Sequence, residues 1–215
     1  MRTSNALALA AFVVAAGWAQ PAAAQLGGRS AEEWMKTLDS PARVQGLKIT
    51  EVVAALKLKP GMLVADIGAG TGVFSIPLAR AVRPGGKLYA VEVDEKLLAH
   101  IVEVGTEQGV TNIESVYAEF NDPLLPPGVD LAFIHDVLHH IEARDVYLKN
   151  LAGYLKPGGR IAVIDFKAGV GGHRNEPAMQ LGQEQVTGMM ATAGMKPAEE
   201  IALFEDKWFV IFVKQ

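Results

Sequence analysis

An acidic residue lies two positions ahead of three alternating glycines in the segment VADIGAGTGVF, residues 64–74. The apolar residues at its start are typical of a buried strand. A glycine-rich turn after such a strand usually holds a nucleotide against backbone N–H groups and a helix N-terminus. Here the turn contains Gly68, Gly70 and Gly72, and the acid is Asp66. The acid restricts the choice of ligand, because a carboxylate repels phosphate.

Two phosphate-binding patterns do not fit this turn. A dinucleotide fingerprint counted from Gly68 needs a third glycine at the position of Val73, and a P-loop needs a lysine after the last glycine. A pyrophosphate beside Asp66 would cost on the order of several kcal/mol at low local dielectric. S-adenosylmethionine has no phosphate and carries a cationic sulfonium and a cationic α-ammonium. The sign of the charge therefore favours this compound over NAD, and the glycines would let the backbone approach its methionine moiety.

Over residues 45–213 the chain resembles the class I S-adenosylmethionine-dependent methyltransferases. VADIGAGTG looks like their glycine-rich first motif, KLYAVEVD is similar to their second strand, and YLKPGGRIAVIDF resembles the segment that enters their fifth strand. DVLHHIE looks like an element that follows strand four in the small-molecule methyltransferases related to ubiquinone and menaquinone C-methylation. Four ordered motifs at family spacing are far more specific than a lone glycine turn.

The resemblance implies a set of cofactor-binding residues at the carboxyl ends of strands one, two and four. Glu92 at the end of the second strand would bind both ribose hydroxyls, and Glu119 or Phe120 after the third strand would face the adenine. The family more often has Gly-Asp in that region, where this chain reads AEFNDP. The expected cofactor-binding residues are Asp66, Gly68, Ala69, Gly70, Thr71, Gly72, Glu92, Val93, Glu119, Phe120 and His135.

A histidine cluster, HDVLHH at residues 135–140, follows the fourth strand at the floor of the expected methyl-transfer site. Helical spacing could place His135 or Asp136 on the same side as His139. An alcohol, phenol or activated carbon acid needs a base, and the catalytic candidates are His139, Asp136 and His140. In the alternative interpretation, one histidine caps and packs while another pairs with Glu142. The spacing matches no established metal motif, so no metal is expected.

The elements that must position these residues alternate along the chain. Apolar strands are expected at 62–67, 87–93, 113–118, 130–135 and 160–166, with helices at 73–82, 95–108 and 144–155. This alternation predicts a Rossmann-like α/β fold with a parallel sheet covered by helices on both faces. After a helix at 183–193, two further strands joined by a tight turn, Glu205–Lys207, predict a C-terminal antiparallel hairpin and seven strands in all.

Two flanking regions complete the expected organisation. Ser30 and Glu33 form a capping-box pattern at the start of a helix ahead of the core. His173 lies in a glycine-rich loop after strand five. That loop could act as a lid over the substrate, and the alternative is that His173 is a solvated surface residue.

The first 24 residues have the three-part layout of a secretory signal. Arg2 precedes an apolar run from Ala6 to Trp18, and Ala22 and Ala24 form a small-x-small cleavage pattern. The run of about 13 residues is too short to span a membrane, which takes roughly 20. We expect cleavage after Ala24 and export, in a bacterium to the periplasm. Residues 25–215 then form a single methyltransferase domain, with N-terminal helices in 25–60, a cofactor-binding core in 61–166 and a C-terminal part in 167–215.

Composition narrows the function further. The 215-residue chain has no cysteine, which excludes disulfides and thiol catalysis, and its net charge of −4 gives no basic surface for nucleic acid. The sequence therefore predicts S-adenosylmethionine-dependent methyl transfer to a small-molecule acceptor by in-line displacement, with no membrane span after signal cleavage. Export conflicts with a cofactor that is made and used inside the cell. Two alternatives are an exported ligand-binding module without methyl transfer and a nicotinamide-dependent oxidoreductase, which Val73 and Asp66 oppose.

Overall fold

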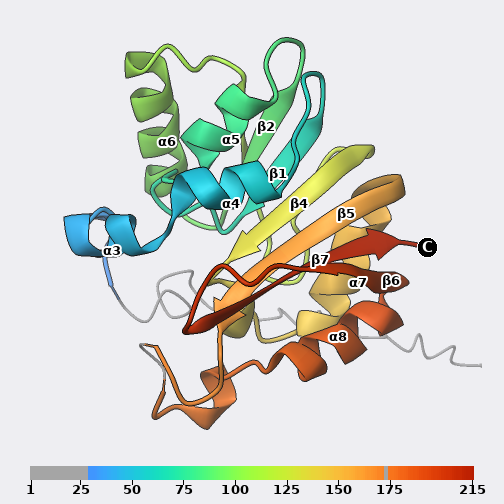
Figure 1. The fold of residues 1–215 in the computed structure, drawn as a ribbon. Helices are drawn as coiled ribbons and strands as arrows, with labels where there is room; N and C mark the ends of the chain where they lie inside the picture. The colour runs from blue at the N-terminus through green and yellow to red at the C-terminus, as the bar shows by residue number, and fades with distance from the viewer. Residues whose placement is uncertain (1–28, 172–173) are drawn as a thin grey trace, which may run out of the picture.

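A computed structural model describes residues 29–171 and 174–215, so the expected signal segment at 1–24 and His173 lie outside the described residues (Figure 1). The strands form one sheet in the order β3-β2-β1-β4-β5-β7-β6. These strands are β1 Leu63–Ile67, β2 Lys87–Glu92, β3 Ile113–Tyr117, β4 Val129–His135, β5 Leu155–Phe166, β6 Met195–Glu200 and β7 Lys207–Lys214. The helices and 3-10 turns are α2 Ala31–Leu38, α3 Pro41–Gly46, α4 Ile49–Ala55, α5 Ser75–Ala81, α6 Glu95–Glu107, η1 Leu138–His140, α7 Arg144–Tyr154, η2 Pro177–Met179 and α8 Gln183–Thr192.

The direction of the strands brings the functional segments to one edge. Strands β1 to β5 pair in parallel, so their carboxyl ends all lie at the same edge of the sheet. The strand order reverses between β1 and β4, and open α/β sheets bind ligands outside the strand ends at such a switch point. The predicted fold, a mostly parallel seven-stranded sheet with antiparallel C-terminal strands, is confirmed.

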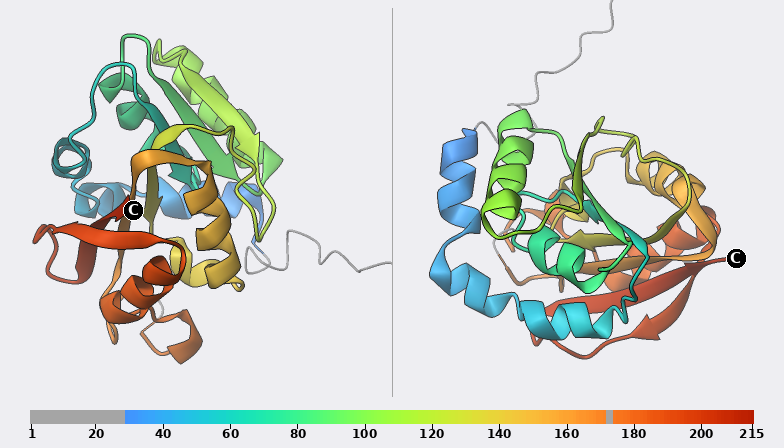
Figure 2. Two further views of the ribbon diagram at one scale, coloured as in Figure 1. Left: turned by 90° about the vertical axis from the view of Figure 1, so that its right-hand side faces the viewer. Right: turned by 90° about the horizontal axis from the view of Figure 1, so that it is seen from above.

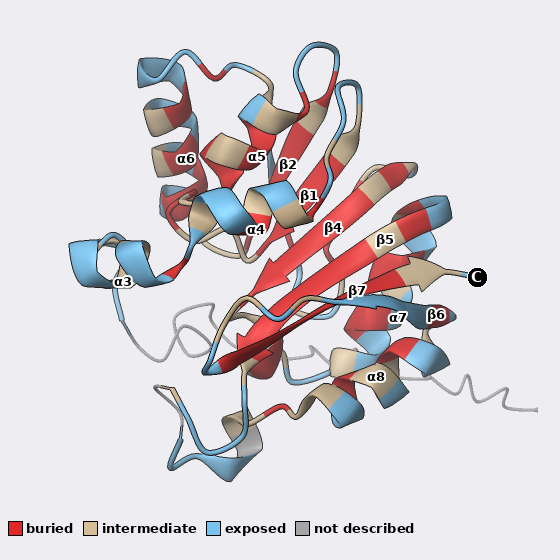
Figure 3. Cartoon of the chain, in the orientation of Figure 1, coloured by how far each residue is buried: buried red, intermediate tan, exposed pale blue. Residues whose placement is uncertain are grey.

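Two apolar layers cover the sheet, because neighbouring residues of each strand point to opposite faces. In β1, Val64 packs with α4 and α5, whereas Ala65 and Ile67 pack with α7 and α8. The central strands are buried along most of their length (Figure 3). A doubly covered sheet gives its strand ends a rigid frame, and the two layers are visible when the molecule is turned (Figure 2).

The end of helix α2 lies at the edge that carries the glycine turn. Helix α2 begins at the predicted capping box, with Glu33 N donating to Ser30 Oγ at 3.2 Å and Ser30 N donating to the Glu33 carboxylate at 2.8 Å. It lies beside α6, where Lys96 pairs with Glu32 at 3.1 Å (Figure 2). In the described ranges no helix is long and apolar enough to cross a membrane.

Some element boundaries differ from the sequence expectation. Strand β5 begins at Leu155 instead of residue 160, because the KPGG segment at 156–159 stays extended. The pairing of β5 with β4 is irregular there, between the pairs Val129–Leu155 and Leu131–Arg160. Helix α5 begins at Ser75 instead of residue 73, since the glycine turn extends to that point.

The C-terminal connection is also longer than the expected tight turn. Strand β6 ends at Glu200, and residues 201–206 link it to β7. The apolar side chains of this link, which include Ile201 and Phe204, pack onto the α4–α5 side of the core instead of continuing a strand.

Candidate active site

The glycine turn uses its own backbone donors internally. Gly68 N and Ala69 N both donate to Val91 O, at 2.9 and 3.0 Å. Gly70 N donates to Glu92 Oε2 at 3.0 Å. A phosphate bound at such a turn would need these N–H groups, and here they already have acceptors, one of them a carboxylate. The turn is therefore unsuited to an anion.

Protein neighbours pack against the bare backbone of the same turn. A Cβ atom on Gly68 would lie 2.4 Å from Val137 Cγ2, and one on Gly70 would lie 2.9 Å from Leu38 Cδ1. Both glycines also have positive φ angles, of +64° and +56°, which favour glycine. The glycines thus let the segment after β4 and the end of α2 approach the turn closely.

Two carboxylates lie under the turn. Asp66 at the end of β1 is only 3% exposed, and its Oδ2 accepts a hydrogen bond from Ser75 Oγ at 2.6 Å. Burial raises the pKa of Asp66 to about 7, the Ser75 hydrogen bond opposes this rise, and Glu92 adds to it. Burial also raises the pKa of Glu92, against the hydrogen bonds from the N–H groups of Val93 and Gly70. Neighbouring buried acids of this kind favour a cationic ligand.

The remaining expected cofactor residues take different positions. Thr71 Oγ1 donates to Asp39 Oδ1 at 2.5 Å, which links the turn to the end of α2. Val93 N donates to Glu92 Oε1 at 2.7 Å and so holds the carboxylate in place. Glu119 is exposed and forms an isolated bridge with Asp122.

Phe120, the other expected adenine contact, is half-buried. Asp94 caps the next helix, since its side chain accepts hydrogen bonds from the N–H groups of Lys96 and Leu97.

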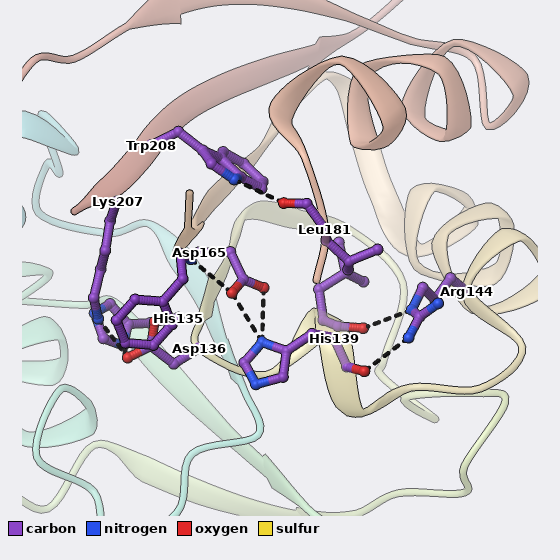
Figure 4. Close-up of polar contacts among 10 residues, drawn as sticks. His135, Asp136, His139, Arg144, Asp165, Leu181, Lys207 and Trp208 are labelled. Carbon is purple, nitrogen blue, oxygen red and sulfur yellow. Dashed lines mark hydrogen bonds and ion pairs between the residues drawn. The ribbon is translucent and has the colours of Figure 1, made fainter. Parts of the chain in front are cut away.

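The histidine cluster separates into two polar groups (Figure 4). His139 is 3% exposed, and its Nδ1 lies 2.8 and 3.1 Å from the two oxygens of Asp165, which is 1% exposed. Arg144 holds the η1 turn by donating to the carbonyls of Leu138 and His139, at 3.1 and 2.8 Å. If Asp165 accepts the Nδ1 proton, Nε2 is left as the basic nitrogen of His139.

The second group joins β4 to β7. Lys207 Nζ donates to Asp136 Oδ2 at 2.5 Å and lies 3.4 Å from His135 Nε2. His135 is buried, and its ring lies 4.8 Å from that of Phe74. Thus His135 and Asp136 share Lys207, whereas the carboxylate partner of His139 is Asp165 (Figure 4).

Sequence patterns did not indicate several residues of this edge. Asp165 lies next to last in the run RIAVIDF, and Lys207 opens the apolar run KWFVIFV. A charged residue at the end of a buried apolar strand is the signal that could have indicated them. Ser75 has no such signal, because its role depends on the turn of chain that brings it under Asp66. His140 is exposed.

A small cavity of about 10 Å³, room for about one water molecule, lies beside His139 and Asp165. Within residues 29–171 and 174–215 no three histidine, aspartate or glutamate side chains are grouped to hold a metal ion.

The comparisons with known proteins agree on one family. A family model described as a methyltransferase domain matches residues 58–199. A ubiquinone/menaquinone biosynthesis C-methyltransferase of Burkholderia multivorans is 26% identical over 114 residues, covering 53% of this chain and 47% of that protein. The corresponding Pseudomonas entomophila enzyme is 30% identical over 111 residues, covering 51% and 43%. The chain thus spans about half the length of the curated relatives it matches.

Solved structures agree on the fold. A SAM-dependent methyltransferase from Aquifex aeolicus matches with a TM-score of 0.78 and 26% identity, covering 87% of this chain and 100% of that one. A magnesium protoporphyrin IX methyltransferase from Synechocystis, solved with bound SAH, matches with a TM-score of 0.67 and 20% identity, covering 86% and 93%. The engaged N–H groups and the buried acids of the glycine turn fit a cationic cofactor without phosphate. The chain therefore belongs to the methyltransferase domain family and has the fold of an S-adenosylmethionine-dependent methyltransferase.

Proposed function

We propose that the protein transfers the methyl group of S-adenosylmethionine to a small-molecule acceptor by in-line displacement. The observation that carries this proposal is the pair of buried carboxylates, Asp66 and Glu92, beneath a glycine turn whose donors are already used. Such a site attracts positive charge and disfavours phosphate. The matched methyltransferase domain and the lack of a basic surface support a small acceptor.

The chain's own residues would bind and orient the reactants. Glu92 would accept hydrogen bonds from the two ribose hydroxyls, and the negative charge of Asp66 would attract the cationic groups of the methionine moiety. The bound cofactor supplies an electrophilic methyl group on sulfur. Alignment of the acceptor in a dry site provides most of the rate enhancement.

His139 is the best candidate for the base that removes the acceptor proton. Asp165 fixes its ring orientation through Nδ1, as an orienting carboxylate does for a catalytic imidazole. Asp136 is less suited, because although burial alone would raise its pKa, the neighbouring His135 and the charges of Lys207 and Arg43 lower the pKa overall.

The first prediction concerns cofactor recognition. Calorimetric titration should show binding of S-adenosylmethionine, and no binding of NAD at the same concentrations. Glu92→Gln should weaken S-adenosylmethionine binding at least about tenfold, because the amide lacks the charge and one acceptor role of the carboxylate. Glu114→Gln, an exposed strand residue paired with Lys87, is the matched control and should bind normally. Tight NAD binding would overturn the proposed function.

The second prediction concerns pH. Between its ordinary value of 3.8 and about 7, Asp66 holds a proton in the folded state that it has lost in the unfolded state. Its contribution to stability is therefore lost progressively as pH rises from about 4 to about 7, and ionisation near 7 strengthens binding of a cation. We expect S-adenosylmethionine affinity to rise from about pH 6 to about pH 8, and the melting temperature of the unliganded protein to fall up to about pH 7 and then level off. Asp66→Asn should flatten both trends, and wild-type-like slopes in this variant would contradict the assignment.

The third prediction concerns the base. Formation of S-adenosylhomocysteine should be measured with a panel of phenols and quinols as acceptors. His139→Gln should lower the rate about a hundredfold without changing cofactor affinity, and Asp165→Asn should also lower it, because the amide favours the wrong tautomer. A larger loss of rate in His140→Gln than in His139→Gln would show that His139 is not the base. Cofactor binding without product from any acceptor would favour the binding-module alternative.

We also propose that the protein is exported, with residues 1–24 removed as a signal peptide. The charged start, short apolar run and small residues before Gln25 support this. A structure with the same fold is titled a possible exported protein from Bordetella parapertussis, at 17% identity and a TM-score of 0.64. Expression of the full chain in a bacterium should give a periplasmic product whose N-terminal residue is Gln25, and Ala24→Trp should block processing. An intact N-terminus in the cytoplasm would contradict export.

A further inference from the structure

Three segments far apart in sequence bring charges to the end of β4. Asp136 directly follows β4, Lys207 opens β7, and Arg43 lies in α3. Strand β7 runs antiparallel to β5, and Lys207 pairs with Phe166 at the carboxyl end of that strand. The start of β7 therefore lies at the edge where the parallel strands end. Neither the glycine turn nor the His139–Asp165 pair includes this group.

Lys207 and His135 both bind the same oxygen of Asp136. Asp136 Oδ2 lies 2.5 Å from Lys207 Nζ and 3.4 Å from His135 Nδ1. Lys207 Nζ also lies 3.4 Å from His135 Nε2, so the ion pair of Lys207 and Asp136 lies against the imidazole ring. The ammonium further rests 4.3 Å from the ring centre of Phe166. The lysine is thereby fixed in one position.

The other oxygen of Asp136 has a different environment. Among the described residues, Asp136 Oδ1 is a buried side-chain oxygen without any hydrogen-bond partner. The residue also has a φ of +54°, a conformation that costs free energy for a side chain other than glycine. A purely structural ion pair would be expected to satisfy both oxygens of a buried carboxylate. This arrangement instead presents one oxygen to a donor that the described chain does not supply.

The balance of charge identifies the kind of donor. Burial lowers the pKa of His135 to about 3, so the ring is neutral, and the charged groups that act on Asp136 are Lys207 and Arg43. Asp39 acts on Arg43, so the group has two cations and two anions, and a protonated amine would leave an excess of positive charge. A hydroxyl fits, because its hydrogen can be donated to Asp136 Oδ1 while its oxygen accepts from Lys207 Nζ.

We propose that Asp136 and Lys207 together bind a hydroxyl group of the methyl acceptor, and that Lys207 is the positioning residue that aims the carboxylate. The inference rests on the proposed function for the identity of the ligand as an acceptor. It concerns binding of the acceptor, so it applies equally to methylation at oxygen or at a neighbouring carbon. It also explains why a lysine is buried at the start of an otherwise apolar strand.

A binding experiment tests this without turnover. The full chain, saturated with S-adenosylhomocysteine, is titrated with 4-nitrophenol, whose ionisation is followed by visible absorbance, and with 4-nitroanisole, which has the same ring without the O–H group. We expect 4-nitrophenol, as the neutral phenol that donates to Asp136, to bind at least about tenfold more tightly than 4-nitroanisole. Lys207→Met should remove this difference.

Matched variants separate binding from folding. Lys214→Met changes a lysine at the other end of β7, where Nζ donates to Ala152 O and Leu155 O, and should bind 4-nitrophenol like the wild type. Lys207→Met leaves Asp136 without its cation, so the double variant Asp136→Asn/Lys207→Met provides a neutral pair that should fold and still bind 4-nitrophenol weakly.

Several outcomes would overturn the inference. Equal affinity of the wild type for the two nitro compounds would do so, as would unchanged 4-nitrophenol binding in Lys207→Met or in the double variant. Wild-type protein that binds S-adenosylhomocysteine but not 4-nitrophenol would overturn this inference and leave the proposed function intact. Failure to bind S-adenosylhomocysteine would instead remove the proposed function, and this inference with it.

Discussion

The electrostatics of the site depend on two carboxylates that are buried at the ends of neighbouring strands. The parallel register of β1 and β2 pairs Asp66 with Ala90, so Glu92 extends just beyond the end of β1. Burying an ionised carboxylate is costly unless other groups bind it. Ser75 hydrogen-bonds Asp66, the N–H groups of Gly70 and Val93 hydrogen-bond Glu92, and the repulsion between the two acids persists. That remaining negative charge is what makes a cationic ligand the compatible one.

A positive charge, that of Lys207, lies at the end of β4, and the direction of β7 places it there. Because β7 runs antiparallel, its first residue reaches the same edge as the last residues of β4 and β5. Lys207 thus lies beside Asp136 although 71 residues separate them. A parallel β7 would have put this lysine at the far edge. The antiparallel C-terminal strands therefore contribute a charge to the site as well as closing the sheet.

Sequence patterns predicted the order and type of the helices and strands better than they predicted the polar side-chain contacts. The alternating strands and helices, the glycine turn and the capping box of Ser30 and Glu33 are local features, and each depends on residues close together in the chain. The pairs His139–Asp165 and Asp136–Lys207 depend on strand register and direction, which no local pattern specifies. The prediction of a tight turn between β6 and β7 was wrong for a related reason.

In that connection, the apolar residues Ile201 and Phe204 leave the strand to cover the core, and tertiary packing overrides their strand propensity. Helical spacing within residues 135–140 also predicts the wrong grouping. Neighbours on one turn would share a site, but long-range partners place His135 and His139 in two separate polar groups.

The short segment from Leu38 to Arg43 connects the two halves of the site. Leu38 occupies the space that the missing side chain of Gly70 leaves, and Asp39 accepts a hydrogen bond from Thr71. Arg43 donates to Leu38 O at 3.0 Å, and its charge acts on Asp136. A glycine at position 70 is thus required by the protein's own packing. Since this segment contacts the glycine turn and carries a charge that acts on Asp136, a displacement of α2 would change the surroundings of both.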